Sequence, residues 1–173
     1  MLEIDLQALE REPREWTERI PVEDGPWSDT DLRFAEPPVA RLRASFAGER
    51  DVHVRGTVEA ELVLDCRRCL RDVRRELVVE LDLLYDPEVE KEGDQEQVYL
   101  LETEAGTLDL APAVREQLLL HVPPYPLCRE DCQGLCPKCG IDRNETSCDC
   151  TLVEPDPRWD TLRELKEEMQ GEE

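Results

Sequence analysis

Residues 52–83 read VHVRGTVEAELVLDCRRCLRDVRRELVVELDL, and their alternation of apolar and polar side chains indicates the class of fold. A period of two residues is typical of strands that bury one face. Cys66 and Cys69 separate two such runs, so this Cys-x-x-Cys pair predicts a reversal between antiparallel strands. Gly56 interrupts the first run, and it predicts a β-bulge at that point.

Neighbouring segments extend this sheet. Residues 39–47, VARLRASFA, alternate in the same way, so the three runs together predict an antiparallel meander. Shorter strands are expected at residues 98–101 and through Leu2, Ile4 and Leu6. The first two thirds of the chain are therefore expected to be built around one antiparallel sheet.

Two helices are expected beyond the meander. Asp109 is a suitable N-cap for the first helix, and Pro123-Pro124 would end it. The second helix begins at Asp156-Pro157, where a cap residue precedes a proline at the first helical position. A narrow apolar stripe, which favours packing against a core, is formed by Trp159, Leu162, Leu165 and Met169.

These elements predict an α+β fold, with an antiparallel β-sheet meander, a packed helix and a C-terminal cysteine-rich zinc module. The expected domains are a sheet domain with one helix at residues 1–127 and a zinc-binding module with a C-terminal amphipathic helix at residues 128–173. Residues 86–97, DPEVEKEGDQEQ, are polar and acidic, which predicts a loop within the first domain.

Acidic residues dominate the composition. The 173 residues include 43 Asp and Glu against 21 Lys and Arg, which gives a formal net charge of −22. This charge repels phosphate backbones at long range, so it disfavours nucleic-acid binding by bulk electrostatics and favours a basic partner. No apolar run approaches the roughly 18 residues that a membrane span needs. The N-terminus, MLEIDLQALEREPREW, lacks a basic start and an apolar core, so we expect no secretory signal and a cytoplasmic location.

The eight cysteines indicate metal binding. Disulfides are rare in a reducing cytosol, where clustered cysteines usually hold metal. Cys136-Pro137-Lys138-Cys139-Gly140 has the form of a knuckle, in which both sulfurs point to one ion and the glycine permits a positive φ. Zinc accepts four thiolates in a tetrahedron. Iron–sulfur clusters also use cysteine, but the knuckle and the cytosolic setting favour zinc.

Eight ligands divide into two sites of four, and two divisions are open. In the favoured division, site A ties the hairpin tip to the segment after the first helix, through Cys66, Cys69, Cys128 and Cys132. Site B then uses the short loop after the knuckle and comprises Cys136, Cys139, Cys148 and Cys150. The rival division places one ion between Cys128, Cys132, Cys136 and Cys139. Its second ion is held by Cys66, Cys69, Cys148 and Cys150.

Sites of this kind favour a structural role. Four thiolates leave no open position for water, so both zinc ions are expected to be structural and zinc catalysis is disfavoured. Redox switching through thiolate oxidation is the alternative for the same residues. His53 and His121 have no neighbour at a spacing that predicts a catalytic set, and the chain has no Gly-rich phosphate loop. We therefore expect no enzymatic activity.

A basic patch lies at the predicted hairpin tip. It consists of Arg67, Arg68, Arg71, Arg74 and Arg75. Arginine forms bidentate pairs with phosphate, so the patch is a candidate contact for RNA or for a partner. The competing interpretation, which we favour, is pairing within the chain to nearby carboxylates, namely Asp65, Asp72 and Glu76.

Several stretches together resemble one family. They are LDCRRCL at 64–70, REQLLLHVPPYPLCREDCQGLCPKCGIDRNE at 115–145, CDC at 148–150, DPRWDTLRELK at 156–166 and the N-terminal LEIDLQALEREP. This set is similar to the YceD family, the large-subunit ribosomal RNA accumulation proteins. The resemblance implies a cytosolic bacterial or plastid protein that is needed for proper accumulation of that RNA. In the family the gene often lies beside that of a large-subunit ribosomal protein, which implies a shared assembly step.

The resemblance and the charge together lead to one expected function. We expect a non-catalytic ribosome biogenesis factor that supports large-subunit ribosomal RNA accumulation and holds two structural zinc ions. Its expected partner is a basic large-subunit ribosomal protein or a pre-ribosomal particle, and the net charge does not favour direct RNA contact. One alternative is a zinc-stabilised acidic adaptor of another cytosolic complex. The other is a thiol redox or metal-dependent enzyme, which would need an open coordination position or an exposed cysteine of low pKa.

Overall fold

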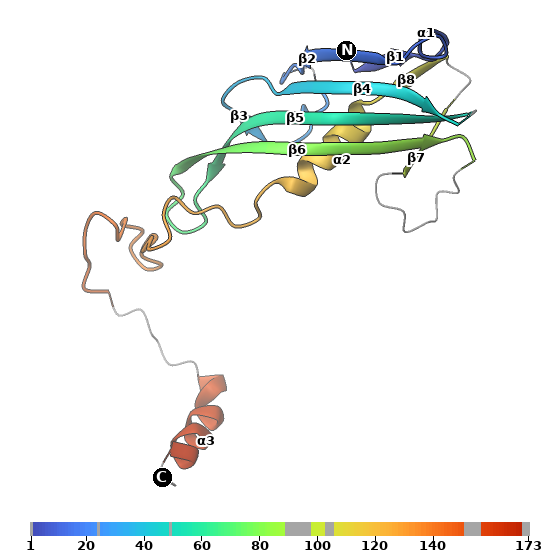
Figure 1. Cartoon of the computed structure of the whole chain (residues 1–173). Helices are drawn as coiled ribbons and strands as arrows, with labels where there is room; N and C mark the ends of the chain where they lie inside the picture. The colour runs from blue at the N-terminus through green and yellow to red at the C-terminus, as the bar shows by residue number, and fades with distance from the viewer. Residues whose placement is uncertain are drawn as a thin grey trace. The chain divides into compact units, whose positions relative to one another are not determined.

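The largest element of the fold is a mostly antiparallel sheet (Figure 1). The structure is a computed structural model that describes residues 2–23, 25–48, 50–88, 98–102, 106–150 and 157–170. The strands of the sheet are β2 (Arg14–Arg19), β3 (Arg33–Phe34), β4 (Val39–Ala47), β5 (Asp51–Asp65), β6 (Asp72–Asp86) and β7 (Val98–Leu100). They are joined in the order β2-β4-β5-β6-β7, and β3 also pairs with β5.

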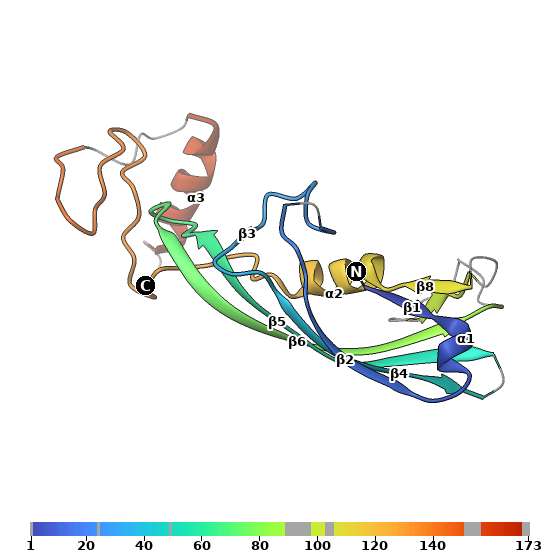
Figure 2. The ribbon, with the colours of Figure 1, turned by 90° about the horizontal axis from the view of Figure 1, so that it is seen from above.

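The predicted meander is confirmed by β4, β5 and β6, each of which pairs antiparallel with the next. The register places Val58 opposite Val79 and Val54 opposite Leu83, and all four side chains are buried. Successive side chains of a strand point to opposite faces, so the polar residues between them lie on the other face. Figure 2 shows the helix α2 (Ala111–His121) lying along one face of this sheet.

Strands β2 and β7 of this sheet differ from the expectation, and the short β3 was not predicted. β2 pairs antiparallel with β4 at the edge of the sheet, although no strand was predicted there. Trp16 is its partly buried apolar residue, so the segment has little period-two signal. β7 pairs with β6 in parallel, with Tyr99 opposite Tyr85. Alternation of side chains gives no information on strand direction, which depends on the connecting chain. Of the predicted acidic loop at 86–97, residues 89–97 lie outside the described part of the chain.

The predicted bulge at Gly56 is wrong. β5 continues through this residue without a break in register, with Leu42 and Leu81 opposite it on the two neighbouring strands. The glycine is needed for another reason, because a Cβ atom there would lie 2.0 Å from the carbonyl oxygen of Arg41. Its φ of 152° is one that other residues rarely adopt.

A small second sheet pairs β1 (Glu3–Asp5) with β8 (Thr107–Asp109). The predicted N-terminal strand is therefore shorter than expected, because the helical turn α1 (Leu6–Leu9) begins directly after Asp5. The carboxylate of Asp5 accepts hydrogen bonds from the backbone N–H groups of Gln7 and Ala8, at 2.8 and 3.1 Å. This cap explains why the strand ends where it does.

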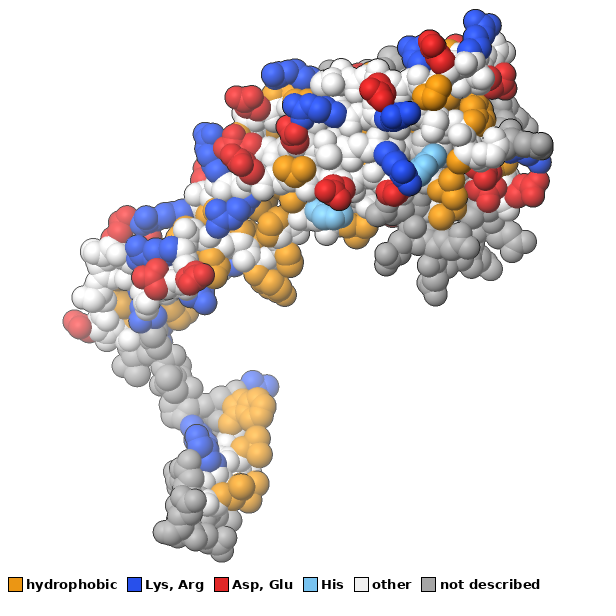
Figure 3. Space-filling model, in the orientation of Figure 1, with side chains coloured by type: hydrophobic (Ala, Val, Ile, Leu, Met, Phe, Trp, Pro, Cys, Tyr) orange, Lys and Arg blue, Asp and Glu red, His pale blue; other side chains and the backbone are white. Residues whose placement is uncertain are grey.

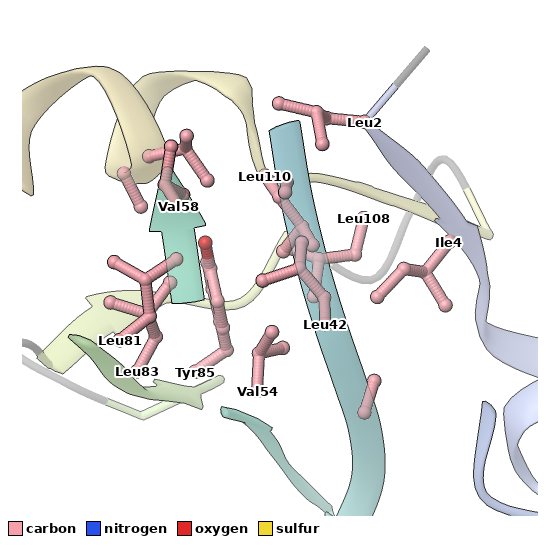
Figure 4. Close-up of a cluster of buried hydrophobic side chains, with 14 of the residues drawn as sticks. Leu2, Ile4, Leu42, Val54, Val58, Leu81, Leu83, Tyr85, Leu108 and Leu110 are labelled. Carbon is pink, nitrogen blue, oxygen red and sulfur yellow. The ribbon is translucent and has the colours of Figure 1, made fainter. Parts of the chain in front are cut away.

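Helix α2 is the packed helix that the sequence predicts, with a small difference at its start. Leu110 occupies the N-cap position, and Asp109 lies one residue earlier, where its carboxylate accepts a hydrogen bond from the N–H of Ala111 at 2.9 Å. Val114 and Leu118 of the helix are fully buried. They belong to the same apolar cluster as the inner face of the sheet, part of which Figure 4 shows. Complete burial of such a side chain contributes about 1.5–3 kcal/mol to folding.

The chain divides into two compact units, Met1–Cys66 with Arg71–Cys128, and Arg67–Leu70 with Arg129–Glu173. The expected domain boundary between residues 127 and 128 stays a prediction. In the second unit, a single 3-10 turn η1 (Pro157–Trp159) leads into α3 (Asp160–Gln170).

The apolar stripe of the C-terminal helix is exposed among the described residues of the second unit, and its expected packing against a core stays a prediction. Trp159 of the 3-10 turn and Leu162, Leu165 and Met169 of α3 have between 51% and 70% of their surface exposed. Figure 3 shows hydrophobic side chains, in orange, along this helix. A stripe at helical spacing shows that one face is apolar, but it carries no information on what covers that face. Among the described helices, none is both long and apolar enough to cross a membrane.

Candidate metal centre

The first Cys-x-x-Cys pair lies in the predicted turn between β5 and β6. The N–H of Cys66 donates a hydrogen bond to the carbonyl of Arg71 at 2.8 Å, which closes the turn. Leu70, the residue after Cys69, has a φ of 60°, in the left-handed region that favours glycine. The turn therefore requires a backbone conformation that leucine adopts at a cost.

The second pair forms the predicted knuckle. The N–H of Gly140 donates to the carbonyl of Cys136 at 2.8 Å, and the N–H of Cys136 donates to the carbonyl of Ile141 at the same distance. Gly140 has a φ of 76°, as the sequence predicts for the residue after Cys139. Gly140 and Leu70 thus occupy equivalent positions in two similar turns.

The structure groups the eight cysteines into two sets of four. Within each set, the four sulfur atoms lie within 4.8 Å of one another. The sets are those of the favoured division, namely Cys66, Cys69, Cys128 and Cys132 for site A, and Cys136, Cys139, Cys148 and Cys150 for site B. The sulfur positions therefore do not match the rival division.

The donor sets fit a tetrahedral cation. Four thiolates at about 2.3 Å from one zinc ion are about 3.8 Å from each other, which is close to the observed grouping. In site A, Cys66, Cys69 and Cys132 are at most 5% exposed. Site B is more accessible, since Cys139 is exposed and Cys148 and Cys150 are partly exposed. Both sets can hold a metal ion, and all four positions of a tetrahedron would be filled by sulfur.

The electrostatics of site B also favour a bound cation. Backbone N–H groups of Cys139 and Lys138 lower the pKa of the Cys136 thiol to about 6, so this thiolate forms first. Hydrogen bonding with the sulfurs of Cys139 and Cys148 raises the pKa of Cys150 to about 12. Four thiolates this close together therefore need a positive ion, and binding of that ion must release protons.

Comparison with known proteins places the chain in a family. The family described as Large ribosomal RNA subunit accumulation protein YceD matches residues 54–166, a range that includes every cysteine of both sites. The chain belongs to the YceD family. The resemblance drawn from the cysteine-containing stretches is confirmed.

Individual relatives of this YceD family member cover different shares of the chain. An uncharacterized protein of Mycobacterium tuberculosis is 32% identical over 158 residues, which is 86% of this chain and 66% of the relative. The Large ribosomal RNA subunit accumulation protein YCED homolog 1, chloroplastic, of Arabidopsis thaliana is 33% identical over 70 residues, 40% of this chain and 22% of the relative. The uncharacterized protein YlbN of Bacillus subtilis is 25% identical over 161 residues, 92% of each chain.

The matched region is thus just under two thirds of the length of the mycobacterial relatives. No solved structure matches the chain.

The arginine patch of this YceD family member is engaged within the chain. Arg68 donates hydrogen bonds to the carbonyls of Glu130 and Cys132, at 3.2 and 2.8 Å. Arg75 donates to the carbonyl of Leu127 at 2.7 Å, and Arg74 pairs with Glu61 at 3.2 Å.

The remaining patch residues, Arg67 and Arg71, also interact with other residues. Of the carboxylates expected to neutralise the patch, Asp65 and Asp72 pair with Arg33, at 2.6 and 2.9 Å. These contacts hold the patch arginines to the hairpin and to the segment that follows α2, and the candidate contact with RNA or a partner stays a prediction.

Three residues near the sites were missed from the sequence. Gly134 has a φ of 71°, and a Cβ atom there would lie 2.7 Å from the carbonyl oxygen of Arg68. That carbonyl accepts a hydrogen bond from the N–H of Leu135 at 2.9 Å, so the two backbones are in direct contact. Leu70 was missed because leucine rarely adopts a positive φ, so the sequence does not indicate the left-handed conformation there. Asn144 lies in the loop of site B. The sequence Asp142-Arg143-Asn144 is typical of a local turn, and this was the signal that could have drawn attention to it.

Proposed function

We propose that this chain is a non-catalytic biogenesis factor of the large ribosomal subunit, which supports accumulation of the ribosomal RNA of that subunit. The observation that carries the proposal is the match to the YceD family over residues 54–166. The name of the Arabidopsis relative, a large ribosomal RNA subunit accumulation protein, adds support. The proposal includes a cytoplasmic location and a division of labour between a sheet domain, residues 1–127, and a zinc module, residues 128–173.

Two structural zinc ions are part of the proposal. Each four-cysteine set supplies the donors that zinc prefers and leaves no position for a reacting water. The low-pKa thiol, Cys136, is only 2% exposed, so it lacks the access that a catalytic thiolate needs. These features support a structural role and argue against a thiol redox or metal-dependent enzyme.

The partner that we propose is a basic large-subunit ribosomal protein, free or within a pre-ribosomal particle. The chain has a net charge of −22, which attracts basic proteins and repels RNA. On the sheet, arginines alternate with acidic side chains, as Figure 3 shows. Many of these arginines are paired, including Arg43 with Glu15 at 3.2 Å and Arg55 with Asp82 at 3.3 Å. Paired arginines have less charge to offer to a phosphate backbone.

A binding experiment tests the choice of partner. The purified full chain is mixed with either large-subunit ribosomal proteins or bare ribosomal RNA at about 150 mM salt, a concentration that weakens non-specific electrostatic contacts. We expect capture of a basic ribosomal protein and no stable RNA complex. Tight binding of bare RNA with a steep salt dependence, weakened by Arg74→Ala, would overturn the partner proposal.

A cellular experiment tests the function itself. Cells that lack the protein should contain less large-subunit ribosomal RNA relative to small-subunit RNA, and the wild-type chain should restore the ratio. Cys66→Ser and Cys136→Ser variants should fail to restore it fully if the zinc module is required. An unchanged RNA ratio in the depleted cells would favour the acidic adaptor of an unrelated complex.

A further inference from the structure

The side-chain amide of Asn144 links the loop of site B to a ligand of site A. Its Nδ2 donates to the sulfur of Cys132 at 3.5 Å and to the carboxylate of Asp142 at 2.6 Å. Its Oδ1 accepts hydrogen bonds from the N–H of Gln133 and from the guanidinium of Arg129, both at 2.8 Å. Asn144 is the only asparagine in the chain.

These four contacts use the whole hydrogen-bonding capacity of the amide. An asparagine side chain has two N–H donors and an oxygen with two lone pairs, and all of them have partners here. A flipped amide would turn its oxygen toward the sulfur of Cys132 and its N–H groups toward two donors. The orientation that donates to the sulfur is therefore fixed by the surroundings.

A hydrogen bond to a ligating sulfur affects the metal site. It stabilises the thiolate form, and it holds the ligand in the orientation in which it binds. Cys132 is 2% exposed, so water is poorly placed to replace this donor. Asn144 is thus an outer-shell partner of site A, although it lies within the site B segment of the sequence.

The loop that carries Asn144 is closed by site B. Its ends, Cys139 and Cys148, belong to the same four-cysteine set. Inside the loop, the carboxylate of Asp142 accepts from the N–H of Asn144 at 2.8 Å. A metal ion that is coordinated by both ends closes the loop. A closed loop has less conformational freedom, so less entropy is lost when Asn144 is held in place.

Backbone contacts place this loop beside the segment that contains Cys132. The N–H of Arg143 donates to the carbonyl of Gly134 at 2.9 Å, and Leu135 forms an isolated bridge with Asp142. The N–H of Cys136 donates to the carbonyl of Ile141 at 2.8 Å. The Asn144 amide and the sulfur of Cys132 are therefore held together by a short paired ribbon as well as by their own contact.

We propose that Asn144 couples the two sites, so that metal binding at site B raises the metal affinity of site A. Metal at site B orders the loop from Cys139 to Cys148, and the loop presents the Asn144 amide to Cys132. Site B is the more exposed set, so it can load first. The inference rests on the proposed metal binding but not on the ribosomal role.

Cadmium NMR of the metal-free protein reconstituted with ¹¹³Cd²⁺ tests the contact. We expect two resonances, assigned by Cys66→Ser for site A and Cys148→Ser for site B. Asn144→Ala should shift the site A resonance and leave the site B resonance in place. Thr146→Ala is the matched control, because Thr146 is an exposed residue of the same loop and its hydroxyl donates to the carbonyl of Asp142 at 3.5 Å. It should move neither resonance.

Zinc affinity of site A, measured by competition with a chelator, tests the coupling. Asn144→Ala should weaken site A by about 10-fold, within the range for loss of an outer-shell partner. Cys148→Ser, which removes site B, should weaken site A by a similar factor. The double variant should be no weaker than either single variant, because both act through one contact.

Four outcomes separate the claims. Additive losses in the double variant, or an unchanged site A resonance in Asn144→Ala, would overturn the coupling while leaving two metal sites intact. Asn144→Asp keeps the acceptor contacts to Gln133 and Arg129 but places a carboxylate oxygen near the sulfur. It should therefore weaken site A at least as much as Asn144→Ala without loss of the fold, and an unweakened site A would also overturn the coupling. Absence of two cadmium resonances in the wild-type chain would contradict metal binding itself.

Discussion

Leu70 and Gly140 have the same left-handed backbone conformation, with φ angles of 60° and 76°, each directly after the second cysteine of a Cys-x-x-Cys pair. The turn that brings two cysteine sulfurs together requires this conformation whichever residue follows. Glycine adopts it freely, whereas leucine has a Cβ atom that crowds the backbone at a cost of about 1 kcal/mol. Leu70 is 64% exposed, so burial of its side chain offsets little of this cost.

A change of Leu70 to valine should therefore destabilise the turn. A β-branched residue tolerates a positive φ less well than leucine, so Leu70→Val should lower the free energy of unfolding by about 1 kcal/mol. Leu70→Gly is the control, because it removes the side chain without the strain and should be at least as stable as Leu70→Val. Chemical denaturation of the metal-loaded chain measures both. A glycine variant less stable than the valine variant would show that side-chain contacts, not strain, matter here.

The two glycines of the second unit should respond differently to alanine. Gly140 has open space around the added Cβ, so Gly140→Ala should cost only the left-handed conformation, about 1 kcal/mol. Gly134→Ala adds a 2.7 Å contact with the carbonyl oxygen of Arg68 and should cost clearly more. The difference between the two unfolding free energies isolates the close approach. Equal losses would mean that the backbone at Gly134 moves aside easily.

Arg68 should matter for stability and Arg74 should not. The guanidinium of Arg68 satisfies the carbonyls of Glu130 and Cys132, and loss of these contacts in Arg68→Ala should cost about 1 kcal/mol and speed zinc loss to a chelator. Arg74 makes an exposed ion pair with Glu61, so Arg74→Ala should change the free energy of unfolding by less than about 0.5 kcal/mol. Similar zinc-release rates in the two variants would contradict the structural role of Arg68.

Tyr85 and Tyr99 lie opposite each other on neighbouring strands, and their changes to phenylalanine should have opposite effects on stability. Among the described residues, the Tyr85 hydroxyl is buried with no hydrogen-bond partner, and burial raises the pKa of this phenol. Tyr85→Phe should therefore stabilise the fold by about 1 kcal/mol. Tyr99 accepts a hydrogen bond from Gln117 at 3.0 Å, so Tyr99→Phe should destabilise it. Thermal unfolding of both variants checks the pair, and a less stable Tyr85→Phe would reveal a water bound to the hydroxyl.

The sheet was largely predictable from the sequence because apolar and polar residues alternate along much of its length. Val58, Ala60 and Leu62 are apolar at every second position, and this pattern is typical of a strand with one buried face. β2 was missed because an edge strand needs few buried side chains. The parallel direction of β7 was missed because side-chain alternation is the same in both directions.

The ligands of both sites were predictable, but their supports were not. Cysteine has few roles in a reducing compartment, so clustered cysteines indicate a metal site directly. The positions of Asn144 and Arg68 near Cys132 depend on how the chain folds back on itself, and no local pattern encodes that contact. The left-handed conformation of Leu70 was hidden for the opposite reason, since leucine rarely adopts it.

Zinc content of paired cysteine variants, measured after dialysis against a competing chelator, is the most direct test of the central claim that two closed four-cysteine sites support this protein. The account predicts two zinc ions in the wild-type chain, one in Cys66→Ser with Cys132→Ser, and none in Cys66→Ser with Cys148→Ser. The reverse pattern, with none in the first pair and one in the second, would establish the rival division of ligands. Bound iron, or a wild-type chain without metal, would contradict the account.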